Sequence, residues 1–358
     1  MKIVIYGAQG IALGTFLALK ETAQDITVDC FLVSKKEGNP SVLGGLPVYE
    51  LKEFIARISE HDRQNVKVFI CTPENVMDDI KTNLIGQGIY DITFIDSIKF
   101  SEMQKKAFLK NKKFVPLELF PIGNQKAKLH VFKMRHSSDK SISLHFKNPD
   151  YMIDLQVGAV KTEKRISKLS DDLGDNISER NGDYSELTGL YWVWKNFLSE
   201  EDMNHYCGLA HYRRLLDFSE NDLLRLLDND IDVVLPYPMP YEPNIEAHHL
   251  RYLIDSEWNA VLQAVDELQP EYAVSFKEIL KQGYYYNYNV ILAKNNVLQD
   301  YCDWLFPLLF RIEEINDPEG IKPPNRFMGY VGETLETLYF MHNKDRLRIT
   351  HTGCRFLM

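Results

Sequence analysis

The chain has 358 residues, of which 45% are hydrophobic and 26% charged, and its formal net charge is -10. This length predicts two domains, and this composition predicts a folded rather than a disordered protein. The acidic balance argues against nucleic acid as a partner. The five cysteines form no CxxC pair and no zinc-site spacing, which predicts reduced thiols in a cytoplasmic protein.

The ends and apolar runs of the chain bear on its location. It opens with the strand-like MKIVIYG, so we expect no secretory signal. No apolar run approaches the roughly 18 to 20 residues that cross a bilayer. We therefore expect a cytoplasmic protein, with peripheral association at the inner face of the cell membrane left open.

Residues 1–122 alternate apolar runs with helical patterns. This alternation predicts a parallel sheet covered on both faces, in a small Rossmann-like domain. The expected strands are 2–7, 28–33, 66–72 and 91–96, the expected helices are 11–22, 51–58 and 74–88, and GNPSVLGGLPVYEL is expected to be a loop.

The first turn of this half contains Gly7 and Gly10, which suit a phosphate at a helix N-terminus or, alternatively, close packing of strand and helix. Asp29 and Ser34 lie near the end of the second strand, where a ribose-binding acid is expected. The strings YGAQGIA and GGLPVYEL resemble the Rossmann-like domain that precedes some bacterial sugar acyltransferases. The repeat domain of those enzymes is absent, so their activity does not carry over.

A second domain is expected to follow a connector. Lys110–Lys128 mixes basic and apolar residues with two prolines, and we place the linker at 123–127 and the second domain at 128–358. Its expected strands are 129–134, 206–212, 231–240 ending in a proline-rich loop, 283–294 entered through an aromatic loop, and 346–353. Its expected helices are 182–198, 223–230, 248–268 as one helix or a pair, 297–315 broken near Pro307, and 332–343 with acids in its first turn.

A series of long strings occurs in order in this second half: DLQVGA, DDLGDNISERNGDYSELTGLYWVWKNF, YCGLAHYRRLLDF, DVVLP, YNYNVILAK, YCDWLF and GYVGETLETLYF. Residues 128–358 thereby resemble the bacterial capsule and exopolysaccharide glycosyltransferases that carry the domain of unknown function 4422. The resemblance implies a GT-A-like α/β domain with a mixed sheet that binds a nucleotide sugar. Some members of the family are galactofuranosyltransferases.

The donor diphosphate is expected near the strand that ends in His211 and Tyr212. GT-A enzymes usually carry Asp-x-Asp there to hold a metal, whereas this chain continues with Arg213 and Arg214. Arginine forks suit phosphate oxygens and could replace the metal, although one of them could instead pair with Asp217. Mn²⁺ or Mg²⁺ stays open as a cofactor, with His351 as a candidate ligand.

The polar string at 171–196 is expected to contact the donor sugar or nucleotide, and the alternative is a solvated capping loop. Its candidate binding residues are Asp171, Asp172, Asp175, Asn176, Glu186 and Tyr191. Ser185, Glu186, Thr188 and Tyr191 are expected on one helix, with Trp192 and Trp194 assigned to the core.

The acceptor side is expected to involve a base and two amides. Glu333, placed by the sequence at the head of a helix, is the first candidate for general base, and Asp255 is the second. Dipole capping is the alternative role of Glu333. Asn287 and Asn289 could bind sugar hydroxyls or form a strand-end turn, and His248 and His249 could lie in an acceptor loop.

Together these features favour an inverting glycosyltransferase of capsule, exopolysaccharide or O-antigen assembly. It would move a hexose, with galactofuranose as one candidate, from a UDP-sugar to an oligosaccharide or lipid-linked acceptor, alongside other polysaccharide-assembly enzymes. One alternative is a catalytically inactive homologue that acts as a scaffold or nucleotide-sugar sensor. Another is a nucleotide-sugar oxidoreductase, which the lack of a Tyr-x-x-x-Lys set in the first half disfavours.

Overall fold

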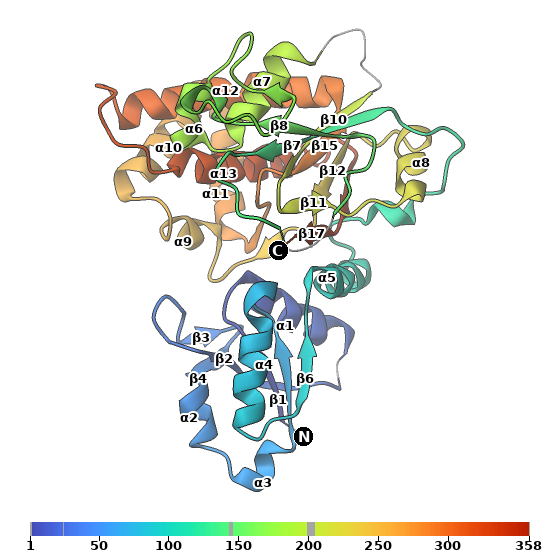
Figure 1. Cartoon of the computed structure of the whole chain (residues 1–358), viewed down its shortest axis with the longest axis vertical. Coiled ribbons are helices and arrows are strands. Elements are labelled where there is room, and N and C mark those ends of the chain that lie inside the picture. The colour runs from blue at the N-terminus through green and yellow to red at the C-terminus, as the bar shows by residue number, and fades with distance from the viewer. Residues whose placement is uncertain (1, 24, 143–145, 199–204, 358) are drawn as a thin grey trace. The chain divides into compact units, whose positions relative to one another are not determined.

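The computed structural model describes residues 2–23, 25–142, 146–198 and 205–357. The chain forms two compact units, Met1–Val115 with Met239–Glu242, and Pro116–Pro238 with Pro243–Leu357. Both units combine sheets with helices (Figure 1), which confirms the α/β fold class. The units divide before Pro116, several residues ahead of the expected linker at 123–127.

The first unit is built on a six-stranded sheet in the order β3-β4-β2-β1-β5-β6. All neighbouring strands are parallel except β3 and β4. The strands are β1 (Lys2–Tyr6), β2 (Val28–Val33), β3 (Val42–Leu43), β4 (Leu46–Glu50), β5 (Val66–Ile70) and β6 (Asp91–Phe94), with β13 (Met239–Pro240) also in this unit. The helices are α1 (Gly10–Thr22), α2 (Leu51–Ile55), α3 (Glu60–Arg63), η1 (Glu74–Val76), α4 (Met77–Gly86) and α5 (Ser97–Asn111).

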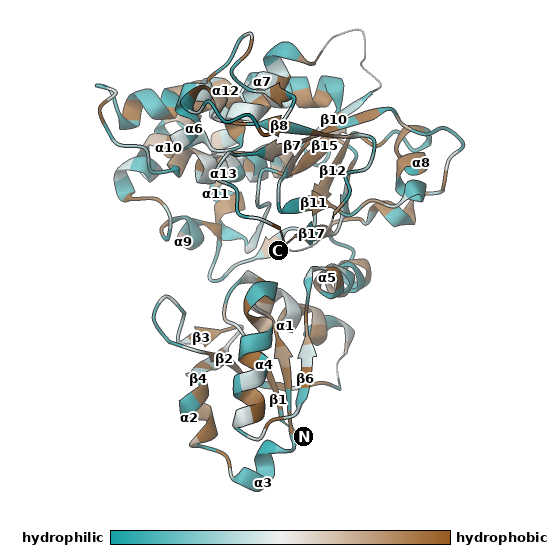
Figure 2. Cartoon of the chain, in the orientation of Figure 1, coloured by the Kyte–Doolittle hydropathy of each residue, from teal (hydrophilic) through white to brown (hydrophobic). Residues whose placement is uncertain are grey.

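Alternate side chains of β1 enter two separate cores. Ile3 and Ile5 pack with residues of α1 and α5, whereas Val4 and Tyr6 pack with residues of α2 and α4. A strand with both faces covered has apolar residues at nearly every position, and Figure 2 accordingly draws much of the sheet of this unit in the brown of hydrophobic residues.

Two expectations for this unit are wrong. The expected loop GNPSVLGGLPVYEL contains β3 and β4, which pair as a hairpin through Gly44 and Gly45. Both glycines have positive φ, +59° and +77°, as a two-residue hairpin turn requires. The expected connector begins too early, because α5 continues to Asn111 and ends at Lys112 in the left-handed region.

The second unit is built on a nine-stranded mixed sheet. Its main path is β16-β12-β15-β10-β7-β8-β9, with β11 paired to β10 and β17 paired to β11. The strands of this sheet are β7 (Leu129–Arg135), β8 (Met152–Gln156), β9 (Leu169–Ser170), β10 (Tyr206–His211), β11 (Arg214–Leu216), β12 (Val233–Pro236), β15 (Ile291–Lys294), β16 (Ile349–Thr352) and β17 (Cys354–Phe356), and the unit also contains β14 (Tyr284–Tyr285) outside the sheet.

The core of this unit contains both aliphatic and aromatic side chains, and it is covered by helices. They are η2 (Leu117–Leu119), η3 (Ala159–Lys161), η4 (Ser178–Arg180), α6 (Asn181–Tyr184), α7 (Leu187–Asn196), α8 (Glu220–Asp228), α9 (Ile245–His249), α10 (Asp255–Leu268), α11 (Pro270–Lys281), α12 (Asn295–Asn316) and α13 (Phe327–His342). The expected segment 248–268 is therefore divided between two helices, α9 and α10. Among the described helices of the chain, none is long and apolar enough to cross a membrane.

The expected single helix at 182–198 is wrong. The chain forms α6 and α7, separated by Ser185 and Glu186, and Ser185 has φ +50°. The Asn181 side chain donates to the Ser185 carbonyl oxygen at 2.7 Å. That bond satisfies a carbonyl at the break.

The expected break at Pro307 is also wrong, because α12 runs without interruption from Asn295 to Asn316. Proline removes one backbone donor, here the partner of the Asp303 carbonyl. Both Pro307 and Asp303 are exposed, so water can satisfy that carbonyl. Burial of neighbours such as Phe306 and Leu309 keeps the helix continuous.

Glu333 does not head its helix. The helix α13 begins at Phe327, which places Glu333 in its second turn, and the first turn contains no acid. The alternative role of dipole capping at the helix start is therefore also wrong.

Candidate functional site

A cavity of about 440 Å³ opens in the second unit at the carboxyl ends of three parallel strands. Met134 and His136 lie at the end of β7, Val157 follows β8, and His211 and Tyr212 lie at the end of β10. β7 is central, because it pairs with β8 on one side and with β10 on the other. The order of the strands therefore reverses at β7, with β8 and β9 on one side and β10 on the other. In open α/β sheets, ligands bind at such a reversal, outside the carboxyl ends of the strands.

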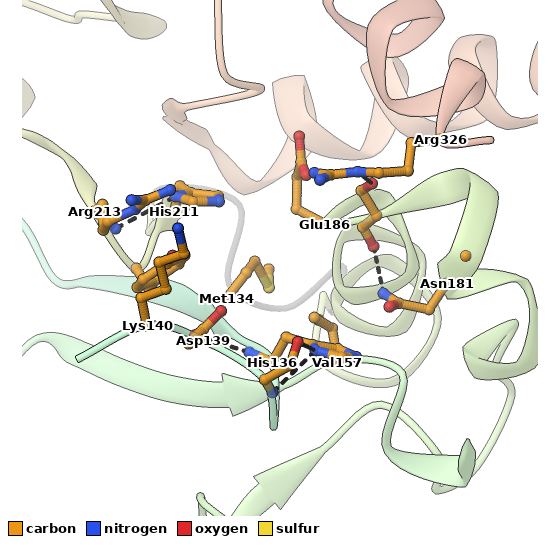
Figure 3. A pocket seen from close by; sticks show the side chains of 14 residues that line it. Met134, His136, Asp139, Lys140, Val157, Asn181, Glu186, His211, Arg213 and Arg326 are labelled. Carbon is orange, nitrogen blue, oxygen red and sulfur yellow. Dashed lines mark hydrogen bonds between the residues drawn. The ribbon is translucent and has the colours of Figure 1, made fainter. Parts of the chain in front are cut away.

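Among the described residues, three positively charged side chains line this cavity: Lys140, Arg213 and Arg326. In Figure 3, Lys140 extends toward His211 and Arg213 on one side, and Arg326 extends toward Glu186 on the other. The acids at the cavity are Asp139 and Glu186. Asp139 is held by the backbone N–H of His136 at 3.0 Å and by Arg135, so it is already paired.

Arg213 retains unused binding capacity. Its guanidinium lies 4.8 Å from the centre of the Tyr212 ring, and its Nε is buried with no hydrogen-bond partner among the described residues. Asp217, the alternative partner considered for it, accepts instead from Arg355 at 2.6 Å. A half-buried cation without a carboxylate partner is well suited to an anionic ligand.

His211 is neutral at physiological pH. Burial, together with the positive charges of Arg214, Arg213 and Arg326, lowers its pKa to about 3. Its Nδ1 accepts the backbone N–H of Arg213 at 3.3 Å. The histidine therefore helps to fix the backbone of Arg213 and adds no positive charge to the cavity.

Glu186 lies on the other side of the cavity from Arg213, beside residues whose backbones are strained. The Asn289 side chain donates to its carboxylate at 2.6 Å and to the Gly329 carbonyl at 3.2 Å. Ser185, Asn289 and Arg326 have φ of +50°, +48° and +67°. Backbone strain of this kind costs about 1–3 kcal/mol per residue and concentrates at functional sites.

Glu186 and Glu333 form an electrostatically coupled pair. Burial raises the pKa of Glu186, while the Asn289 hydrogen bond and the Arg326 charge oppose that rise. Burial and, to a smaller extent, the negative charge of Glu186 together raise the pKa of Glu333 to about 8. Asn287 donates to Glu333 at 3.3 Å. Glu333 is absent from the described residues that line the cavity, whereas Glu186 faces it.

A family model described as domain of unknown function, DUF4422, matches residues 132–344, more than half of the chain. The chain belongs to this family. The region therefore contains every residue that lines the cavity, from Met134 to Arg326. The sequence resemblance to DUF4422 is thus confirmed, and its further implications for capsule synthesis stay predictions.

A solved structure titled as the apo structure of the WbbM bifunctional glycosyltransferase is similar to the chain, with 26% identity and a TM-score of 0.56. The match covers 64% of this chain and 45% of that one, so the chain spans less than half of that protein. No curated protein matches the chain. The DUF4422 chain thus shares its fold with a glycosyltransferase.

The side chains of the polar string at residues 171–196 bond mainly to other residues of the chain. Asp171 is completely buried and accepts from the backbone N–H groups of Gly158 and Ala159 and from the hydroxyls of Ser178 and Thr188. Four donors saturate a carboxylate. The structure thus gives Asp171 an internal anchoring role, with no capacity left for a ligand.

The other predicted residues of this string also have internal partners. Asp172 pairs with Arg165 at 2.6 Å, and Asp175 accepts from the Tyr191 hydroxyl at 3.0 Å. Asn176 bonds the backbone within its own turn. Trp192 and Trp194, expected in the core, donate to the Leu173 carbonyl and to Asp303, and the Trp194 ring stacks on Phe306.

Two further candidates lie apart from the residues that line the cavity. Asp255 is exposed in the first turn of α10. The Arg214 guanidinium lies 4.4 Å from the Phe356 ring centre and 4.9 Å from that of Tyr288, where it packs rather than faces the cavity.

The described residues provide no group of three or more His, Cys, Asp and Glu that could hold a metal. His351 is buried, and its Nε2 lies 2.8 Å from the Tyr286 hydroxyl. His248 and His249 are buried on α9, and burial lowers their pKa values to about 4 and 3. The described side chains therefore do not fit a divalent cation held by three or more protein ligands.

In the first unit, the turn at Gly7 is closed by its neighbour. A Cβ at Gly7 would lie 2.5 Å from the Cys71 carbonyl oxygen, and φ at Gly7 is +128°. This geometry favours the packing role of Gly7 over phosphate binding. Asp29 accepts the backbone N–H of Ile3 at 2.9 Å, and Ser34 bonds the Tyr6 hydroxyl.

The sequence prediction missed Lys140, Arg326, Asn181 and His136, all of which line the cavity. A detectable signal existed for His136, because it follows β7, the first strand of the domain. Arg326 precedes α13 in a segment whose only sequence signal was proximity to the GYVGETL string.

Proposed function

We propose that the DUF4422 domain is a glycosyltransferase of bacterial surface polysaccharide assembly. It transfers a hexose, with galactofuranose as the first candidate, from a UDP-sugar to an oligosaccharide or lipid-linked acceptor. The observation that carries the proposal is the cavity at the ends of β7, β8 and β10, where Lys140 and Arg213, which form no ion pair with a described carboxylate, lie across from the carboxyl group of Glu186. The fold shared with a glycosyltransferase and the family membership support it.

The diphosphate of the donor is proposed to lie between Lys140 and Arg213. The arginine fork can bind two phosphate oxygens at once, and both cations stabilise the negative charge that develops on the leaving diphosphate. Because the described side chains do not fit a protein-held metal, we assign no step to Mn²⁺ or Mg²⁺.

Glu186 is proposed as the general base, in place of Glu333 or Asp255. An acceptor hydroxyl in the cavity would give its proton to Glu186 as its oxygen bonds the anomeric carbon and the bond to the diphosphate breaks, with inversion. A base must be ionised before it acts. Glu333, with a pKa of about 8, is mostly protonated at pH 7 and does not line the cavity.

The amides have supporting roles in this scheme. Asn289 holds Glu186 in position. Asn181 lines the cavity from α6, and because its amide nitrogen donates to the Ser185 carbonyl and the Thr188 hydroxyl, its amide oxygen is the atom proposed to accept from sugar hydroxyls. Arg326 lies beside Glu186 and favours its ionised form.

The test is release of UDP from a panel of UDP-hexoses, UDP-galactofuranose included, in the presence of saccharide acceptors. We expect turnover with at least one donor, and its loss in Glu186→Gln with UDP binding retained. Glu246→Gln, an exposed change outside the cavity, is the matched control. UDP binding without turnover of any donor would favour the alternative of an inactive scaffold or sensor, and no UDP binding would refute both.

A further inference from the structure

The exposed face of α5 in the first unit combines lysines with large apolar side chains. Ile98 and Leu109 are 49% and 36% exposed. They are eleven residues apart, close to three full helical turns, so they share one side of the helix. Lys99, Lys106 and Lys110 are exposed on the same side. We call these five residues the basic face of α5.

The opposite side of α5 is fixed in the core. Phe100 is buried in the cluster that also contains Ile5 and Leu13, and Phe108 is buried as well. The helix is anchored at its start, where the Asp96 carboxylate accepts the Lys99 N–H at 2.8 Å. The basic face is therefore held in a defined orientation.

The charge of this segment opposes that of the chain. Residues 97–113 contain six lysines and one acid, a net charge of +5 in a chain of net charge -10, which leaves -15 for the remainder. Lys99 and Lys110 donate to backbone carbonyls, those of Phe94 and Glu21. Within the described part of the chain, Lys99, Lys106 and Lys110 form no ion pair with a carboxylate.

We propose that the basic face of α5 docks on an anionic lipid bilayer, with Ile98 and Leu109 entering the interfacial region and the lysines contacting lipid phosphates. An amphipathic helix with lysines beside exposed apolar residues binds such surfaces through apolar burial and charge attraction together. The acidic remainder of the chain is repelled by the same surface, which makes α5 the favoured contact. The proposal does not depend on the transfer reaction.

The experiment is co-sedimentation of the full chain with vesicles of phosphatidylcholine alone or mixed with phosphatidylglycerol, at low and high salt. We expect binding to the anionic vesicles only, weakened by salt. The double variant Lys106→Glu/Lys110→Glu should weaken binding at least about tenfold, because each lysine near an anionic surface contributes about a fivefold factor.

Two further variants separate the electrostatic and the apolar contributions to vesicle binding. Lys277→Glu/Lys344→Glu makes the same charge change at exposed sites of the second unit and should bind normally. Ile98→Ser/Leu109→Ser keeps the charge and should also lose binding. Melting temperatures close to wild type would show that each variant is folded.

Several results would overturn the proposal. They are equal binding to neutral vesicles, equal loss in the Lys277 and Lys344 control, and full binding by Ile98→Ser/Leu109→Ser. Binding to a single-stranded oligonucleotide without binding to anionic vesicles would identify a polyanion site instead and would equally overturn it.

Discussion

Two polar regions of the DUF4422 domain look alike in sequence and differ in what their side chains contact. The carboxylate of Asp171 is surrounded by four donors of its own chain. Arg213 and Arg326 face a cavity, and the buried Nε of Arg213 has no partner among the described residues. Polar density in a sequence therefore does not distinguish a saturated internal network from an open site. Substitutions should separate the two, with stability lost in the first region and activity lost in the second.

The largest expected effect is on turnover. Glu186→Gln should lower the turnover rate by about 10²- to 10⁴-fold, because it removes the group proposed to accept the acceptor's proton. The unfolding midpoint should change little, because glutamine can still accept from Asn289. Steady-state UDP release and a thermal melt check both statements, and normal turnover would show that Glu186 is not the base.

Next comes the stability of the saturated network. Asp171→Ala should lower the free energy of unfolding by about 3 to 5 kcal/mol, because it leaves the buried N–H groups of Gly158 and Ala159 unpaired. Urea denaturation measures this loss. Glu179→Ala, an exposed change in the same segment, is the control. An unchanged unfolding free energy would mean that Asp171 is not an anchor.

Affinity for the nucleotide should depend on the open region. Arg213→Ala should weaken UDP binding by about 10- to 100-fold, because it removes charge-assisted hydrogen bonds to phosphate. Arg213→Lys should recover part of that loss, since lysine retains the charge but not the fork. Lys344→Ala serves as a control, and unchanged affinity in Arg213→Ala would place the diphosphate elsewhere.

Glu333 should make stability depend on pH. Its pKa, about 8 in the folded protein, lies above that of an unfolded glutamate, so the folded state binds more protons between about pH 4.5 and 8. Stability should fall as pH rises through that window, by no more than about 1.4 kcal/mol per unit. In Glu333→Gln this contribution should disappear. Urea unfolding at pH 5, 6.5 and 8 tests this, and parallel pH profiles for the two proteins would contradict it.

The smallest expected effect is on the free energy of unfolding, for a substitution beside the hydrogen-bonded network of Asp171. Tyr191→Phe removes one hydrogen bond to Asp175 and should cost about 1 kcal/mol of unfolding free energy. Its UDP affinity should equal that of the wild type. A loss of affinity would bring this region into the binding site and weaken the contrast drawn above.

The regular elements could be predicted from local pattern, whereas the breaks in them could not. The alternation of strand and helix predicted the parallel sheet of the first unit. The break at Ser185 and the continuity of α12 through Pro307 depend on Asn181 and on burial of Phe306, which are tertiary effects. The β3–β4 hairpin was missed although its two adjacent glycines are a recognised turn signal.

The cavity could be predicted only in part, for a similar reason. His211, Tyr212, Arg213 and Glu186 were expected at the site and do line the cavity. Lys140 and Arg326 also line it, but they lie 186 positions apart and follow no shared pattern. Aspartate is a residue type that often contacts ligands, so Asp171 was expected at the site. Only the folded structure shows that four donors of the chain already occupy its carboxylate.

The most direct test of the central claim is a calorimetric titration of UDP, and separately of uridine, into the full chain in the presence of EDTA, repeated with Mn²⁺. An open cationic cavity predicts that UDP binds without metal and at least about tenfold more tightly than uridine, because Arg213 and Lys140 contact the diphosphate. UDP binding that requires Mn²⁺, or equal affinity for UDP and uridine, would contradict the account.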